Sequence, residues 1–214
     1  GIVGRADLME EIARIYGYER IPETHLAAPL PPQRGNPSLE GEERVRDTMV
    51  SLGLQEIITH RMTAPEIENR LLPKGTPALA RDYVKLANPI APEKRVMRRS
   101  LLSSVLVVVE RNARLRDSLA LFEIGSVYVP RGAELPDEPR RLVLALTGKR
   151  YESAWDVNAN QRLDFYDLKG MVEALMAALH LDVSYVPAQD ASFLPGKSAQ
   201  LMLDGTPLGV FGEL

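Results

Sequence analysis

Three carboxylates near the start of the chain have the spacing that most suggests metal chemistry. Asp7, Glu10 and Glu11 stand at positions i, i+3 and i+4, which project from one side of a helix. Their oxygens suit a hard cation such as Mg²⁺. The same residues also suit the first turn of an ordinary helix, because the helix dipole stabilises acidic side chains there. The residues alone favour the ordinary helix start and leave a cation site open.

No other set of side chains has the pattern of a catalytic or cofactor site. The chain has no cysteine, which excludes disulfides, thiolate zinc sites and cysteine nucleophiles. His25, His60 and His180 do not have metal-ligand spacing, and Ser103 and Ser104 have no neighbouring general base. A glycine-rich phosphate-binding loop is also missing. We therefore predict no catalytic and no cofactor-binding residue.

A group of basic residues in the middle of the chain is a second candidate for binding. Such side chains could contact phosphate or an acidic partner surface. A solvated or salt-bridged surface explains them without any partner, and the sequence favours that interpretation. The residues are Lys94, Arg95, Arg98, Arg99, Arg111, Arg114 and Arg116.

The overall composition limits the class of protein. The 214 residues contain 26 Lys plus Arg against 29 Asp plus Glu, a formal charge of -3, and 45% of them are hydrophobic. These values exclude a disordered polyelectrolyte and a generally basic nucleic-acid binder. The most apolar stretch, Leu101–Val109, falls far short of the roughly 20 residues of a membrane helix. Without a secretory signal or an initiator methionine, we expect a processed product or a fragment that does not enter a membrane.

Periodicity predicts the elements that position these residues. Apolar residues at helical spacing predict a helix over 7–17, with Asp7 as its N-cap and Gly17 at its left-handed end. Five prolines between Ile21 and Pro37 predict an extended connector. Further helices are predicted over 38–52, 63–72, 100–115 and from 164 onward, and strands over 54–62, 83–87, 119–129, 141–148, 183–186, 198–203 and 208–211.

These elements indicate an α+β fold, an antiparallel sheet flanked by helices. Strands 119–129 and 141–148 are expected to pair across a loop rich in proline and glycine. Asp204 and Gly205 form a hairpin-turn pair between two of the last strands. Strands in neighbouring hairpins, without strict strand–helix alternation, favour an antiparallel arrangement.

Short motifs follow one another in a fixed order along nearly the whole chain. They are Asp7–Pro22, Gly53–Ile57, Leu86–Ile90, Val96–Leu102, Leu121–Gly125, Asp164–Gly170 and Pro195–Ala199, with Gly212–Leu214 at the end. Such an ordered series is far more specific than a single motif. Together the motifs resemble the beta-subunit family of bacterial phenylalanyl-tRNA synthetase.

The resemblance implies a fold, a role and partners. Residues 38–214 are similar to a class II aminoacyl-tRNA synthetase catalytic domain, truncated at its C-terminus, after a small-module tail over 1–22 and a linker over 23–37. In this family the alpha subunit forms the adenylate from ATP and phenylalanine with Mg²⁺, and the beta copy of the fold does not. The expected assembly is a cytoplasmic dimer of alpha–beta pairs that binds tRNA. The partners of this chain would be the alpha subunit and a second beta subunit.

One position supports a silent nucleotide site. Active class II enzymes carry an arginine for the ATP phosphate just after an aromatic residue of the second signature strand, where its guanidinium can bind in a bidentate manner. Here Tyr128 is followed by Val129 and Pro130, whose side chains cannot bind phosphate.

The resemblance also bears on the acidic cluster. Asp7, Glu10 and Glu11 match positions that the family assigns to Mg²⁺ at the alpha–beta boundary, together with an aspartate six residues before Asp7. This chain has Gly1 there, which departs from the pattern. The metal assignment therefore depends on three of the four ligands.

Two other functions remain open beside the structural subunit. One is a free-standing class II-like module that binds an amino acid or a nucleotide. The other is a direct RNA-binding domain. Its binding residues would be Arg95, Arg98, Arg99, Arg111 and Arg114.

The structural-subunit hypothesis predicts an interface helix. Helix 38–52 resembles the first class II signature, a helix and strand used for dimerisation. The outer apolar residues of this helix would then be unusually exposed. Burial of the whole apolar stripe of Val45, Met49 and Leu52 in the chain's own core would remove the physical support for an interface.

A second expectation concerns one strand. Phe122 and Glu123 must point to opposite faces, so if Phe122 packs on the helix over 101–109, Glu123 faces the substrate groove of an active enzyme. We expect Glu123 to hold hydrogen bonds or a salt bridge there in place of a nucleotide.

Overall fold

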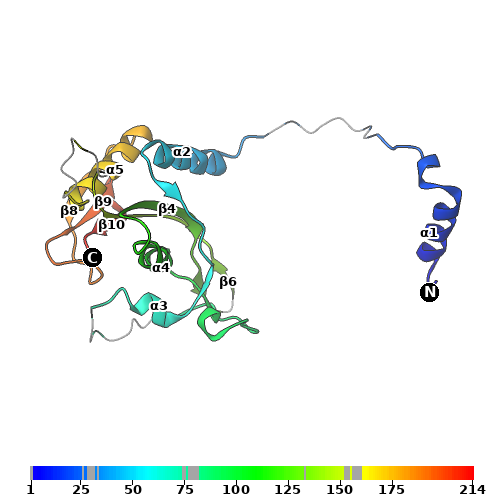
Figure 1. Ribbon diagram of the computed structural model, residues 1–214, viewed down its shortest axis with the longest axis horizontal. Helices are drawn as coiled ribbons and strands as arrows, with labels where there is room; N and C mark the ends of the chain where they lie inside the picture. Colours follow the sequence, from blue (N-terminus) through cyan, green and yellow to red (C-terminus); the bar gives the residue numbers. More distant parts are fainter. Residues whose placement is uncertain are drawn as a thin grey trace. The chain divides into compact units, whose positions relative to one another are not determined.

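The chain folds into two compact units, Gly1–Gly35 and Asn36–Leu214 (Figure 1). The computed structural model describes residues 2–25, 27, 32, 34–73, 76, 82–132, 134–151, 155 and 161–214. Much of the predicted proline-rich connector lies outside these described residues. Among the helices that are described, none has the length and apolar character needed to cross a membrane.

The first unit is built around helix α1, Arg5–Tyr16. The prediction that Asp7 caps this helix is wrong, because the helix begins earlier and Gly4 is the N-cap. Asp7 lies in the first turn and reaches backward, where its Oδ2 accepts the N–H groups of Val3 and Gly4 at 2.8 and 2.9 Å. Gly17 ends the helix at φ 102°, a backbone angle that favours glycine, as predicted.

The second unit contains a central sheet with the strand order β1-β4-β7. Strands β4, Ser118–Ser126, and β7, Arg140–Gly148, pair antiparallel along their whole length, which confirms the predicted pair. The short strand β1, Gln55–Glu56, joins β4 in parallel. The sheet is therefore mixed, with an antiparallel pair as its main part.

Helices cover both faces of this sheet (Figure 1). Helices α2, Pro37–Ser51, and α5, Phe165–Ala178, pack on one face, and α4, Leu102–Asn112, contacts β4 and β7 from the other. The main apolar core lies under α2 and α5. Its buried members are Met49, Leu54, Phe122, Val172, Leu175, Met176 and Leu201.

A second, antiparallel sheet has the order β10-β9-β8. Its strands are β8, Ser184–Pro187, β9, Ser198–Leu203, and β10, Thr206–Gly212. Asp204 and Gly205 join β9 to β10 with φ of 48° and 76°. Positive φ at both central residues is what a tight hairpin turn of this kind requires, so the predicted turn is confirmed.

The segment between β1 and α4 differs most from the predictions. In place of one strand over 54–62 the structure has two short strands, β1 and β2, Met62–Thr63. The backbone between them does not continue the pairing of β1 with β4. The strand expected over 83–87 is an isolated bridge between Lys85 and Val96. The helix expected over 63–72 is the shorter helix α3, Pro65–Asn69, and its N-cap is Ala64. The other short elements are η1, Tyr18–Arg20, η2, Pro92–Lys94, β3, Val96–Met97, β5, Val129–Arg131, and β6, Glu134–Asp137.

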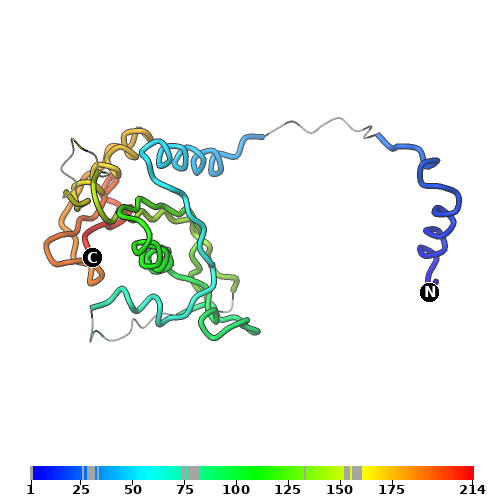
Figure 2. The backbone as a smooth tube through the Cα atoms, viewed as in Figure 1, coloured from blue at the N-terminus to red at the C-terminus, as the bar shows by residue number. Residues whose placement is uncertain are grey.

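The same segment carries the chain from one side of the sheet to the other. After α2 the backbone runs past the edge of the sheet and reaches α3, which packs against α4 (Figure 2). This path brings Thr59 to Glu123 on the face of β4 that α4 covers, and Glu68 to the backbone of Arg99 ahead of α4.

Candidate functional site

The face of β4 toward α4 holds a buried ion pair between Arg98 and Glu123. Both side chains are 2% exposed, and Arg98 Nη1 lies 2.7 Å from Glu123 Oε1. The same Nη1 also donates to Thr59 Oγ1 at 2.8 Å, and Arg98 Nε donates to the carbonyl of Ser126 at 2.9 Å. Thr59 closes the network, because its hydroxyl donates to Glu123 Oε2 at 2.7 Å. Both carboxylate oxygens of Glu123 thus have a protein partner.

Three elements converge to build this network. Arg98 directly follows β3 and is fixed by its backbone N–H, which donates to the carbonyl of Arg61 at 2.9 Å. Glu123 comes from β4, and two residues on, Gly125 points to the same face. A Cβ on Gly125 would lie 2.3 Å from Arg98 Nη2, so only glycine leaves room for the guanidinium there.

The prediction for Phe122 and Glu123 is partly confirmed. The two side chains do face opposite sides of β4, and Glu123 holds a salt bridge and hydrogen bonds. The expectation that Phe122 packs on the helix over 101–109 is wrong. Phe122 packs in the core with Met49 and Leu175 under α2 and α5. The side of the sheet toward α4 carries Glu123 instead. Where a groove was expected, the polar network and Leu101 fill the space beside Gly125.

The position at which active class II enzymes carry a phosphate-binding arginine was expected to be silent, and it holds the apolar residues Val129 and Pro130. Val129 and Pro130 begin strand β5, where Val129 pairs with Asp137. Tyr128 before them is buried, and its N–H donates to the carbonyl of Arg98 at 2.9 Å. This segment supports the buried network rather than offering a cationic group to a ligand.

Glu68 is a buried carboxylate that sequence reasoning missed. It is 1% exposed, and its Oε1 accepts the N–H groups of Arg99 and Ser100 at 2.8 and 3.2 Å. Tyr83 donates its hydroxyl to Oε2 at 3.0 Å. Glu68 therefore fixes α3 to the segment that leads into α4. In the sequence it stands among other polar helix residues, and nothing marks it as buried.

Two of the three carboxylates considered for Mg²⁺ are engaged in other contacts. Asp7 accepts the two backbone N–H groups at the helix start, which hold the pKa of its carboxyl below the usual value. Glu11 forms an ion pair with Arg14, and Glu10 is exposed. The described His, Asp and Glu residues include no group of three that could hold a metal ion. In this arrangement the three carboxylates do not form a cation site, and the assignment of Mg²⁺ to them stays a prediction.

The basic residues fall into two groups. Arg95 pairs with Glu66, Arg98 is buried, and Arg99 donates to the carbonyl of Asp82 at 2.7 Å. These three are used within the domain. Further along the chain, Arg111, Arg114 and Arg116 are exposed.

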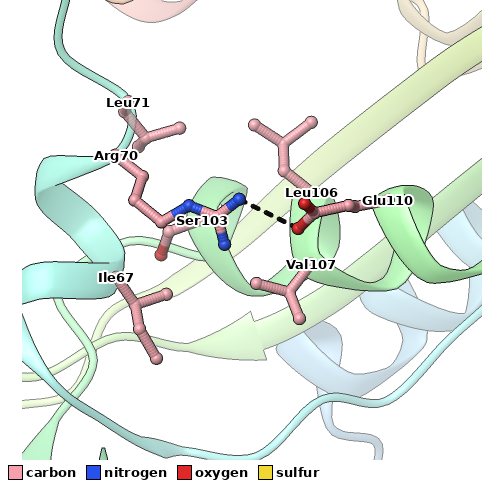
Figure 3. Close-up of a pocket in the computed structure, with 7 residues that line it drawn as sticks. All are labelled: Ile67, Arg70, Leu71, Ser103, Leu106, Val107 and Glu110. Carbon is pink, nitrogen blue, oxygen red and sulfur yellow. Dashed lines mark hydrogen bonds and ion pairs between the residues drawn. The ribbon is translucent and has the colours of Figure 1, made fainter. Parts of the chain in front are cut away.

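A small cavity separates α3 from α4 (Figure 3). It measures about 130 Å³, and Arg70 and Glu110 form an ion pair of 2.9 Å across it. Ser103 is buried at its wall, and its hydroxyl has no hydrogen-bond partner in the described structure. The lining residues are Ile67, Arg70, Leu71, Ser103, Leu106, Val107 and Glu110. The volume is below the range of about 300–1,000 Å³ that is usual for ligand sites.

Helix α2 is only partly enclosed by the chain. Met49 is fully buried, whereas Val45 and Leu52 are half-buried against the same core. On its outer surface Leu39 and Val50 are each 55% exposed. A groove of about 580 Å³ runs between α2, α5 and the ends of β4 and β7. The apolar stripe is thus not fully buried, and the role of α2 at a subunit interface stays a prediction.

Known proteins resemble this chain in sequence and in fold. The phenylalanine–tRNA ligase beta subunits of Symbiobacterium thermophilum and Geobacter metallireducens are 40% and 39% identical to it, over 97% of this chain but 23% and 26% of their own lengths. The chain therefore spans about a quarter of these curated relatives. A pyrrolysyl-tRNA synthetase structure from Desulfitobacterium hafniense has a TM-score of 0.58 at 18% identity, over 95% of this chain and 64% of that one. This likeness confirms the predicted class II synthetase-like fold.

The family assignment follows from the sequence match. The family model of the phenylalanyl tRNA synthetase beta chain CLM domain matches residues 21–214, which include the whole of the second unit and the segment before it. The buried network and the missing phosphate-binding side chain lie within this match. The chain belongs to the phenylalanyl-tRNA synthetase beta chain family and carries its CLM domain.

Proposed function

We propose that this domain is a non-catalytic structural part of a phenylalanyl-tRNA synthetase beta subunit. In this proposal the alpha subunit binds ATP, Mg²⁺ and phenylalanine and attaches phenylalanine to its tRNA in the cytoplasm. The observation that carries the proposal is the buried pair of Arg98 and Glu123, which occupies the face of β4 beside α4. Val129 and Pro130 add no phosphate-binding group.

Isothermal titration tests the absence of substrate binding. The chain is titrated separately with ATP plus Mg²⁺ and with phenylalanine, and the complete alpha–beta enzyme serves as the positive control. We expect no heat of binding for the chain and stoichiometric binding for the enzyme. A stoichiometric signal from the chain would favour the alternative, a free-standing module that binds an amino acid or a nucleotide.

The proposed partner surface is the outer face of α2. Leu39 and Val50 are about three helical turns apart and so lie on one face of the helix, where both are half exposed. Their exposure fits an alpha-subunit contact within a dimer of alpha–beta pairs. We expect Leu39→Asp with Val50→Asp to prevent co-purification with the alpha subunit. Leu135→Asp is the control, because Leu135 is 88% exposed on the separate strand β6.

The Mg²⁺ assignment needs its own test. Asp7 and Glu11 would have to exchange their present protein partners for the cation, which Glu10 could bind together with them. Titration of Mn²⁺ into the alpha–beta enzyme, followed by water-proton relaxation, measures such a site. Loss of one bound ion in Glu10→Gln with Glu11→Gln would support the assignment, and unchanged binding would reject it.

A further inference from the structure

The end of the domain where α4 meets the β4–β7 pair carries an unusual excess of unpaired arginines. Arg111 lies in the last turn of α4, and Arg114 and Arg116 follow in the turn that leads to β4. All three are exposed, and none of their guanidinium groups forms a hydrogen bond or ion pair in the described structure.

A second segment adds cations to the same end. Lys149 directly follows β7, and its N–H donates to the carbonyl of Asp117 at 3.1 Å. Lys149 also forms a β-bridge with Arg162, whose exposed side chain has no partner either. The ends of α4, β4 and β7 thus bring Arg116, Lys149 and Arg162 close together. We call Arg111, Arg114, Arg116, Lys149 and Arg162 the basic end.

The basic end differs from the other cationic surfaces of the chain. Among the described carboxylates, Asp117 pairs with Lys149 of the basic end at 2.8 Å, and Glu110, which directly precedes Arg111, pairs with Arg70. Of the fifteen described arginines elsewhere, eight have an acidic partner, whereas none of the four arginines of the basic end has one in the described structure. The helix dipole explains a cation in the last turn of α4, but not the cations on the other segments. The paired arginines are Arg14, Arg46, Arg70, Arg95, Arg98, Arg131, Arg140 and Arg150.

The chemistry of the basic end favours phosphate over an acidic protein. Guanidinium groups match phosphate oxygens with paired N–H donors. A protein interface needs an apolar centre. In the described parts of residues 111–118 and 149–162 the large exposed apolar side chains are Leu115, Tyr151 and Trp155, and aromatic rings such as the last two also stack on nucleic-acid bases. A polyanion with regularly spaced charges needs no such centre.

We propose that the basic end binds the phosphate backbone of an RNA, with Arg111, Arg114, Arg116 and Arg162 as the main contacts. This inference rests on the proposed function only in assuming that an RNA reaches the domain. It replaces the arginine set expected from the sequence, because Arg95, Arg98 and Arg99 are used inside the fold.

Fluorescence anisotropy with a labelled tRNA tests the proposal. The chain is titrated at about 50 and about 200 mM salt, because phosphate contacts weaken steeply over that range. The variant is Arg111→Gln, Arg114→Gln, Arg116→Gln. We expect about a tenfold loss of affinity at the lower salt and a salt slope shallower by about 2, since each phosphate contact contributes about 0.7–0.9.

A matched variant removes the same charge elsewhere. Arg5, Arg44 and Arg141 are exposed, and their guanidinium groups lack partners in the described structure. Arg5→Gln, Arg44→Gln, Arg141→Gln should change the affinity less than about twofold and leave the slope intact, because none of these three arginines belongs to the basic end. Circular dichroism and thermal unfolding check that both variants remain folded.

Three results would overturn the proposal. One is no binding of tRNA at low salt, and another is an equal loss of affinity in both triple variants. The third is binding of a labelled poly-glutamate peptide that is as tight as that of tRNA and depends on the same three arginines, which would assign the surface to an acidic protein. Each result differs from failure of the proposed function, which shows as heat with ATP or phenylalanine.

Discussion

The side chains on the two faces of β4 are buried in different surroundings. Toward α2 and α5, Phe122 packs among apolar side chains such as Met49, which is 0% exposed. Toward α4, the adjacent Glu123 is almost as deeply buried but is surrounded by Arg98 and Thr59. One strand therefore separates an apolar core from a face on which a buried ion pair lies among apolar residues such as Leu101 and Leu121.

The difference shows what each face can tolerate. An apolar core loses stability roughly in proportion to the volume removed from it. A buried ion pair contributes little net stability by itself, but removal of one partner leaves an uncompensated charge in a low dielectric. The polar face should therefore be the more sensitive to single substitutions and the more tolerant of a paired apolar replacement.

The largest effect is expected for Glu123→Ala. The change leaves the Arg98 guanidinium buried at 2% exposure without its carboxylate. The free energy of unfolding should fall by about 4 kcal/mol. Urea unfolding measures this loss in the free energy of unfolding. The double variant Arg98→Met, Glu123→Leu is the control and should recover most of the loss, whereas equal losses in the single and double variants would contradict the comparison.

Met49→Ala is the corresponding test of the apolar face. Met49 is completely buried beside Phe122 and Val172, so the truncation leaves a cavity. We expect a loss of about 3 kcal/mol in the same unfolding assay. Met49→Leu keeps the volume and should cost less than about 1.5 kcal/mol. A loss in Met49→Ala larger than that in Glu123→Ala would reverse the proposed order of the two faces.

A third test probes the space for the guanidinium. A Cβ at Gly125 would lie 2.3 Å from Arg98 Nη2 and 3.2 Å from Glu123 Oε1. Gly125→Ala should therefore cost about 2 kcal/mol, through displacement of the ion pair. Gly170→Ala in α5 is the matched control, because nothing lies within 4 Å of its Cβ position. It should stabilise the domain by up to about 1 kcal/mol, since alanine favours a helix. Similar effects at both glycines would refute the steric argument.

The sequence predicted the parts of this fold that depend on local signals. Helix α5 begins after Asp164 as expected, and the turn at Asp204 and Gly205 joins its two strands. The strand over 54–62 failed because Thr59 bonds to Glu123, which is 64 residues away, instead of continuing the ladder. Pairing of Arg98 with Glu123 depends on a similar long-range contact, which no local pattern reports. The sequence therefore indicated that Glu123 would find a partner, but not which one.

The smallest effect is expected at the start of α5, where the contacts are exposed. Asp164 Oδ1 accepts the N–H groups of Tyr166 and Asp167 at 2.8 and 3.3 Å, and its Oδ2 lies 3.2 Å from Arg150 Nη2. Asp164→Ala removes both the cap and this ion pair, and we expect a loss of about 1 kcal/mol in urea unfolding. Asp164→Asn keeps the cap and removes only the charge, and exposed ion pairs contribute little, so it should stay within about 0.5 kcal/mol of the parent chain. If Asp164→Asn were as unstable as Asp164→Ala, the ion pair with Arg150 would be the main contribution. An exposed ion pair would then contribute to stability as the buried pair at Glu123 does. In that case burial would not explain the contrast between the two faces of β4.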